Sequence, residues 1–166
     1  MRLTVFLAAF SVPALAQPDA SVVAALDTCV RSALPDMTAA ETCTGHHFAL
    51  CQTEDERQRW EGALRCQREM GAAWDALLAQ TWPAALDWAR QTDAFTANQS
   101  DPAPSAEDAL RAAWPAWAAW RDAECALQGL AWPSDPLMIE MARTGCWHHL
   151  TASRVIDLYA MIRGPE

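Results

Sequence analysis

Hydrophobic residues recur with the spacing of an α-helix along most of this chain, and no segment shows the two-residue alternation of a half-buried strand. Proline, glycine and short polar side chains interrupt this pattern where helices should begin and end. The second helix should start at a cap on Asp36 or Thr38, and the third at Thr53 or Asp55. The predicted helices span residues 20–32, about 36–51, about 53–90, 105–127 and 137–162. The pattern therefore predicts an all-α, antiparallel bundle of about five helices.

Two prolines and two connecting segments refine this bundle. Pro83 and Pro115 fall inside predicted helices, and each should kink or break its helix because proline removes a backbone hydrogen bond. Residues 92–104 and 129–136 are rich in proline and short polar residues, so they are predicted to be loops. A chain of 166 residues suits one domain.

Residues 1–16 have the pattern of an export signal. Arg2 precedes an apolar run over residues 3–12, and Ala14-Leu15-Ala16 forms a small-x-small cleavage site. This run is shorter than the roughly 20 residues that span a bilayer. The alternative is a buried N-terminal element. We expect cleavage after Ala16, which leaves a single helical domain over residues 17–166 in the periplasm or outside the cell.

All the cysteines follow the predicted signal, and their number is even. They are Cys29, Cys43, Cys51, Cys66, Cys125 and Cys146. In an oxidising compartment six cysteines indicate three disulfides. Consecutive pairs flank turn residues, and two helix ends folded back across a turn come close enough to be bridged. We therefore expect the pairs Cys29–Cys43, Cys51–Cys66 and Cys125–Cys146. A zinc site is the competing interpretation, but no CxxC or HxxxH spacing supports it.

The charge balance limits the classes of partner. Arginine supplies all 12 basic residues against 21 acidic ones, so the formal net charge is −9. Nucleic acid and anionic lipid surfaces are excluded as partners, because both require clustered cations. No segment after the signal is long and apolar enough for membrane insertion. A partner recruited by long-range electrostatics should be basic.

Patterns typical of catalysis or cofactor binding are missing from the sequence. It contains no GxSxG, and its glycines are scattered rather than gathered in a phosphate loop. The doublets His46-His47 and His148-His149 place neighbouring side chains about 100° apart on a helix, so we predict surface or helix-end residues. No enzyme activity, cofactor or metal is expected. The alternative is a glycan-acting enzyme with paired carboxylates.

Tryptophans concentrate in the fourth predicted helix. Trp114, Trp117 and Trp120 form a stripe that drifts slowly around the helix, and Arg121 and Asp122 follow directly. Such a stripe usually packs into a core, and the alternative is a recognition surface.

An arginine falls on the apolar face of the last predicted helix. Arg154 shares that face with Leu150 and Thr151. Because a buried unpaired charge is costly, we expect Arg154 to pair with Glu124 or Asp75 from a neighbouring helix. The alternative is that Arg154 extends to solvent at the edge of the face.

The spacing of these residues resembles the lysozyme inhibitor LprI-like family. The resemblance covers residues 51–162 and rests on a Trp-Arg-Asp-Ala-Glu-Cys stretch, a second cysteine, Leu-Thr and an arginine one turn later. An upstream cysteine leading to an Asp-x-Leu-Leu segment also matches. The motif residues are Asp75, Trp117, Trp120, Arg121, Asp122, Glu124, Leu150, Thr151 and Arg154. Cys29 and Cys43 form an additional N-terminal element.

The resemblance implies an exported, cysteine-bridged helical protein without catalysis that binds and inhibits lysozyme. Animal-type lysozymes are strongly basic, which suits an acidic binder. An inhibitor must occupy a cleft that holds two carboxylates, which favours a protruding loop. The turn from Gly129 to Asp135, with Trp132 and Ser134, is the candidate, and residues 92–104 are the second one. The rival interpretation is a non-catalytic structural or interaction protein of the bacterial envelope.

Overall fold

The computed structural model describes residues 18–45, 56–97 and 104–164, and its regular structure in these ranges is entirely helical. The helices are α1 (Ala20–Ala33), α2 (Met37–Thr42), α3 (Glu56–Thr96), α4 (Ala106–Gly129) and α5 (Pro136–Arg163). They confirm the predicted all-α class. The predicted signal over residues 1–16 lies outside the described residues.

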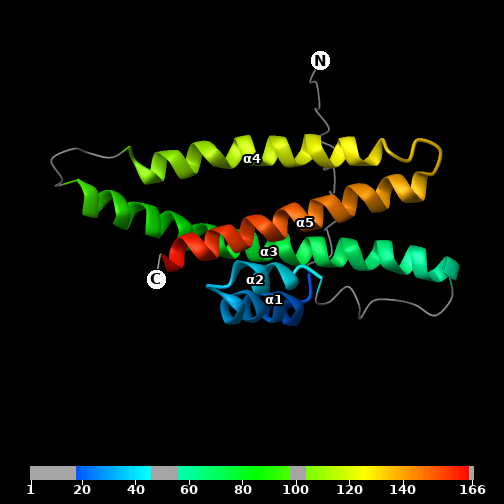
Figure 1. Ribbon diagram of the computed structural model, residues 1–166, viewed down its shortest axis with the longest axis horizontal. Helices are drawn as coiled ribbons and strands as arrows, with labels where there is room; N and C mark the ends of the chain where they lie inside the picture. Colours follow the sequence, from blue (N-terminus) through cyan, green and yellow to red (C-terminus); the bar gives the residue numbers. More distant parts are fainter. Residues whose placement is uncertain (1–17, 46–55, 98–103, 165–166) are drawn as a thin grey trace, which may run out of the picture.

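The three long helices run in alternating directions, so that α4 is antiparallel to both α3 and α5 (Figure 1). Helices α3 and α5 are consequently parallel neighbours, and they form the centre of the molecule. Arg68 on α3 bonds Glu140 on α5 at 3.0 Å, and further along both helices Asp75 accepts a hydrogen bond from Trp147. Helices α1 and α2 cover one side of this pair, and α4 covers the opposite side (Figure 1).

The main core lies where α1 and α2 meet the α3–α5 pair. Trp74 on α3 has no exposed surface, and Leu26 and Val30 of α1 and Val155 of α5 are equally inaccessible. Each fully buried side chain of this size contributes about 2 kcal/mol through the hydrophobic effect. Among the described helices, none combines the length and the apolar character that crossing a membrane requires.

Helix α2 is shorter than predicted, because it ends at Thr42 and not near residue 51. Its cap is Asp36, one of the two predicted candidates, whose carboxylate accepts from the Ala39 amide at 3.0 Å. The amides of Cys43, Thr44 and Gly45 bond carbonyls three residues back, which tightens the end of the helix into a turn. Cys43 is also fixed by its disulfide, so the chain leaves the helix there.

Helix α3 is longer than predicted and continues through Pro83 to Thr96, into the segment expected to be a loop. Asp93 near its end accepts hydrogen bonds from Ser105 Oγ at 2.9 Å and from the amides of Ala106 and Glu107. These bonds lower the pKa of Asp93, the two backbone amides most strongly. Asp93 thus joins the end of α3 to the beginning of α4. Pro115 likewise lies inside an unbroken α4.

Two predicted disulfides are confirmed. The sulfurs of Cys29 and Cys43 are 2.02 Å apart and join α1 to the end of α2, and those of Cys125 and Cys146 are 2.00 Å apart and join α4 to α5. The third predicted pair includes Cys51, which lies outside the described residues.

Candidate partner-binding site

A buried arginine brings together the three long helices in the region where the sequence motifs lie. Arg121 on α4 is only 8% exposed, although it is charged. Its guanidinium carbon lies 4.7 Å from the ring centre of Trp117 and 3.4 Å from that of Trp147. A cation between two indole rings is stabilised by their negative faces, and more strongly when water is excluded.

The polar contacts of Arg121 reach both neighbouring helices. Its Nη1 donates to Thr151 Oγ1 on α5 at 3.1 Å and lies 3.7 Å from Asp75 Oδ1 on α3. Its Nε and Nη2 donate to Asp122 Oδ1, both at 3.3 Å. We call Asp75, Trp117, Arg121, Trp147 and Thr151 the Arg121 cluster.

Asp75 completes the Arg121 cluster from the α3 side. Its Oδ2 accepts from Trp147 Nε1 at 3.2 Å, and its Oδ1 accepts from Thr151 Oγ1 at 3.5 Å. Although 46% of its side chain is exposed, partial burial raises the pKa of Asp75, and the hydrogen bond from Trp147 and the charge of Arg121 oppose that rise. The cluster holds α3, α4 and α5 together, and its arginine has almost no surface left for a partner.

The prediction that Arg154 pairs with Glu124 or Asp75 is wrong. Arg121 occupies the position beside Asp75, and Glu124 accepts instead from Gln128 on its own helix at 3.1 Å. Arg154 lies 5.9 Å from the ring centre of Trp117, and its buried Nε has no hydrogen-bond partner. The charge of Arg154 acts instead on Asp157 of its own helix, where it opposes the rise in pKa that burial causes.

The remaining motif residues lie around this cluster. Trp120 is 51% exposed on the outer side of α4, and Leu150 is half-buried on α5. Trp114 and Trp117 are half-buried with ring centres 5.5 Å apart, and Trp82 of α3 packs 4.5 Å from Trp114. The tryptophan stripe is therefore divided, with two rings against the bundle and one facing solvent.

The turn between α4 and α5 carries the predicted partner-binding residues. Trp132 is 47% exposed, Leu130 is more exposed still, and Ser134 is exposed beside them. Asp135 has a structural role, because its Oδ1 accepts hydrogen bonds from the amides of Leu137 and Met138 and so caps α5. Trp132 and Ser134 are available to a partner, and their role in binding stays a prediction.

A cavity of about 330 Å³ lies between α4 and α5. Asp122, Glu140, Arg143 and Thr144 supply its polar walls, and Trp147 is shared with the Arg121 cluster. The aliphatic part of the Arg143 side chain packs against Gly129, where an added Cβ would lie 2.8 Å from Arg143 Cγ. Glu140 and Arg143 were not predicted from the sequence, where their only signal is an acidic and a basic residue one turn apart near the start of a helix.

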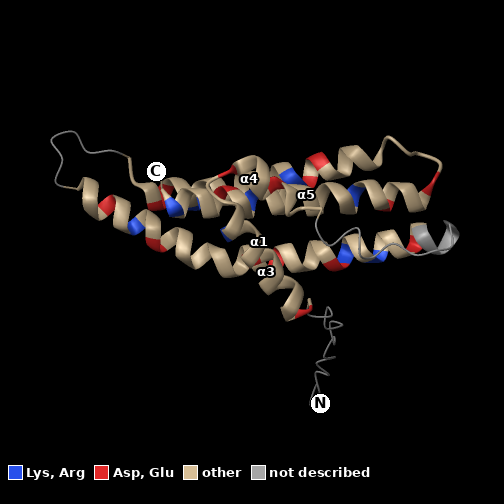
Figure 2. Ribbon diagram, turned by 60° about the horizontal axis from the view of Figure 1, so that its bottom comes forward, with Lys and Arg blue, Asp and Glu red and all other residues tan. Residues whose placement is uncertain are grey.

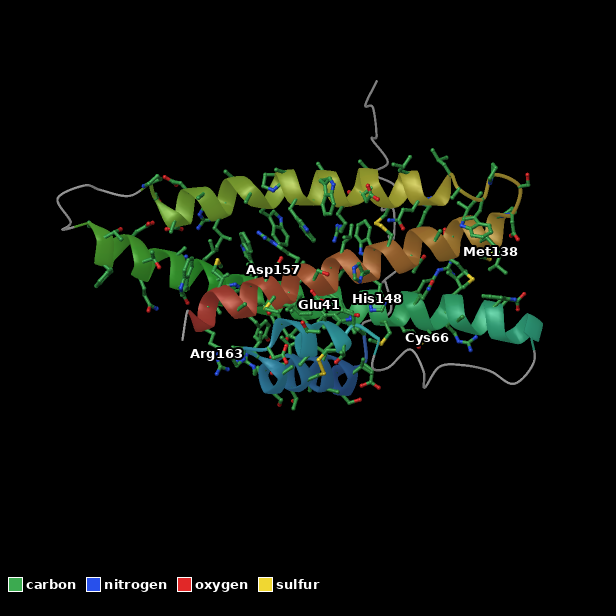
Figure 3. The ribbon with its side chains drawn as sticks, in the orientation of Figure 1. Glu41, Cys66, Met138, His148, Asp157 and Arg163 are labelled. Carbon is green, nitrogen blue, oxygen red and sulfur yellow. A yellow bond between two sulfur atoms is a disulfide. The ribbon has the colours of Figure 1, made fainter. Side chains whose placement is uncertain are left out.

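One histidine of the two doublets differs from the prediction. His148 is buried at 8% exposure rather than lying at the surface, while His149 is exposed, and His46 and His47 lie outside the described residues. Figure 3 shows His148 and Glu41 where α2 meets α5. Burial lowers the pKa of His148, although a hydrogen bond with the backbone of Thr44 opposes this change. Among the described residues, no group of His, Cys, Asp and Glu side chains is arranged to hold a metal ion.

The burial of His148 predicts a pH dependence of stability. Its pKa is lower in the folded chain than the ordinary 6.5, so the unfolded chain binds the proton more tightly. Stability should therefore decline as the pH falls below about 6.5, until the folded histidine is itself protonated. His148→Gln should flatten the unfolding free energy between about pH 7 and pH 5 in urea titrations. His149→Gln, one residue away and exposed, is the control, and equal flattening in both variants would contradict this assignment.

Comparison with known proteins then decides the family. A family model described as "Lysozyme inhibitor LprI" matches residues 51–158. The chain belongs to the LprI family. No curated protein and no solved structure gives a match to it. The LprI match takes in α3, α4, most of α5 and the whole Arg121 cluster, whereas α1 and α2 precede it.

Proposed function

We propose that this LprI-family protein is exported, loses residues 1–16 and acts as a single domain over 17–166 that binds and inhibits lysozyme in the periplasm or outside the cell. It acts by binding and not by catalysis, and it uses no cofactor. The observation that carries the proposal is an exposed aromatic turn inside the LprI match. Trp132 is presented by that turn, and Cys125–Cys146 and the Arg121 cluster fix both helices behind it.

The charge of the molecule supports a basic partner. Acidic residues lie on all three long helices (Figure 2), and the formal net charge is −9. Long-range electrostatic attraction accelerates association with a strongly basic protein such as lysozyme, and this attraction weakens as salt is added. The turn itself is neutral or apolar from Leu130 to Ser134, so it can approach a cleft lined by carboxylates without repulsion.

Replacing Trp132 tests the role of the turn. Trp132→Ala is expected to raise the concentration for half-inhibition of lysozyme at least tenfold in a turbidity assay, because exposed tryptophans that become buried dominate binding energies. Phe95→Ala is the matched control, since Phe95 is a 77% exposed aromatic residue near the end of α3 that lies farthest from the turn (Figure 1).

Three outcomes separate the possibilities. Loss of inhibition in Trp132→Ala alone supports the turn as the binding element. Full inhibition by Trp132→Ala would show that the binding site lies elsewhere on the protein. No inhibition by the unmodified, disulfide-bonded protein would overturn the proposal and favour an envelope protein with a different partner.

A further inference from the structure

The cavity between α4 and α5 carries charges of both signs that the fold leaves partly unpaired. Its carboxylate on α4, Asp122, accepts from Arg121 only through Oδ1, and Oδ2 bonds no residue that the structure describes. Its arginine on α5, Arg143, is exposed and forms no ion pair or hydrogen bond within the described part of the chain. The third charged side chain, Glu140, is already bonded to Arg68 at 3.0 Å. The cavity therefore offers both an acceptor and a cation to a ligand.

The disulfide between α4 and α5 determines where these two charges lie relative to each other. The Cα atoms of Cys125 and Cys146 are 5.3 Å apart, and the two helices are antiparallel (Figure 1). Asp122 precedes Cys125 by three residues, and Arg143 precedes Cys146 by three residues, so they lie on opposite sides of the disulfide. Each is displaced by about 4.5 Å along its helix, which places the two Cα atoms about 9 Å apart along the common axis.

The wall of the cavity between these two charges is uncharged. Cys125 and Ala126 of α4 and Thr144 and Trp147 of α5 line it. Trp147 belongs to the Arg121 cluster, whose contacts hold its ring in one orientation before any ligand binds. The hydroxyl of Thr144 can donate or accept a hydrogen bond. A ligand that matches this wall has a positive end, a short uncharged middle and a negative end.

We propose that this cavity binds a short zwitterionic peptide, with its ammonium group at Asp122 and its carboxylate at Arg143. The bond from an ammonium group to a carboxylate is charge-assisted, and the planar guanidinium can hold a carboxylate through two parallel N–H···O bonds. Because the two charges lie at different levels of the cavity, they give the peptide one orientation. The cavity volume of about 330 Å³ is roughly twice that of a protein cavity that accepts benzene, which suits a dipeptide.

Titration of the disulfide-bonded protein with dialanine at neutral pH, followed by the amide signals in NMR spectra, tests this site. Dialanine should shift the signals of residues 122–126 and 143–147 with a dissociation constant of about 1 mM, as expected for a ligand of this size. N-acetyl-dialanine lacks the ammonium group, and dialanine amide lacks the carboxylate. Each should bind about tenfold more weakly than dialanine, because each loses one charge-assisted hydrogen bond.

Two variants assign each end of the peptide to its residue. Arg143→Met should weaken dialanine binding about tenfold and leave the weak binding of dialanine amide unchanged, because the amide has no carboxylate to lose. Asp122→Asn should likewise weaken dialanine binding and leave that of N-acetyl-dialanine unchanged. Arg111→Met and Asp108→Asn are the matched controls, since they remove the same charges at exposed positions nearer the start of α4. Circular dichroism checks that all variants are folded.

The inference is wrong if dialanine shifts none of these signals at about 10 mM, or if its three forms bind equally. It is also overturned if dialanine amide binds as tightly as dialanine, which would indicate a site for cations. Binding of N-acetylglucosamine in place of dialanine would indicate a sugar site and contradict it too. Trp132 does not line the cavity, so Trp132→Ala should bind dialanine normally, and failure of this site and failure of the proposed function are distinguishable.

Discussion

Replacing Arg121 by methionine should lower the free energy of unfolding by about 3 kcal/mol. The guanidinium lies between the rings of Trp117 and Trp147 and donates to Thr151, so the change removes stacking and a buried hydrogen bond together. The Asp75 carboxylate would lose its positively charged neighbour, but its side chain is half-exposed and water can solvate it. The expected loss of stability is therefore at the lower end of what breaking a buried ion pair costs. Urea unfolding with intact disulfides measures this change.

Two further variants separate charge from shape at this site. Arg121→Lys keeps the charge but not the planar group that stacks on both rings, so its stability should lie between those of the unmodified protein and Arg121→Met. Arg111→Met is the control at an exposed arginine of the same helix, where only a small change is expected. If Arg121→Met stayed within about 1 kcal/mol of the unmodified protein, the Arg121 cluster would not be the tie between the helices.

The second large effect concerns the disulfide between α4 and α5. Cys125→Ala/Cys146→Ala opens a loop of 21 residues and should cost about 3 kcal/mol. The same change should weaken lysozyme inhibition, because the two helices that carry the α4–α5 turn lose their covalent link. Thermal unfolding and the turbidity assay, run on one preparation, measure both effects.

The N-terminal disulfide provides the matched comparison. Cys29→Ala/Cys43→Ala opens a loop of 14 residues, so the expected loss of stability is similar. It lies outside the LprI match and on the side of the bundle opposite α4, so inhibition by the folded variant should be retained. Equal loss of inhibition in both variants would indicate that overall stability, and not the geometry of the turn, governs activity.

Features set by neighbouring residues were predictable from the sequence. Helical spacing predicted the bundle, Asp36 was one of the two caps predicted for α2, and close spacing across turns predicted the pairs Cys29–Cys43 and Cys125–Cys146. In each case the relevant residues are near one another in the chain, so local geometry decides the outcome.

Features that depend on tertiary packing were not predictable. The position of Arg154 on an apolar face led to its prediction as a partner of Asp75. The structure instead places Arg121 of α4 beside that carboxylate, which depends on how α3, α4 and α5 pack together. His148 is buried where the backbone of Thr44, just after the end of α2, forms a hydrogen bond with it. Periodicity along one helix carries no information about which neighbour covers it.

Direct binding to lysozyme tests the central claim, that this LprI-family protein is a lysozyme-binding module. Calorimetric titration of lysozyme with the purified, disulfide-bonded protein should reveal a complex at low ionic strength whose affinity falls steeply as salt is added. Trp132→Ala should bind at least tenfold more weakly under the same conditions, and Phe95→Ala should bind as the unmodified protein does. The absence of any complex at low ionic strength would contradict the account.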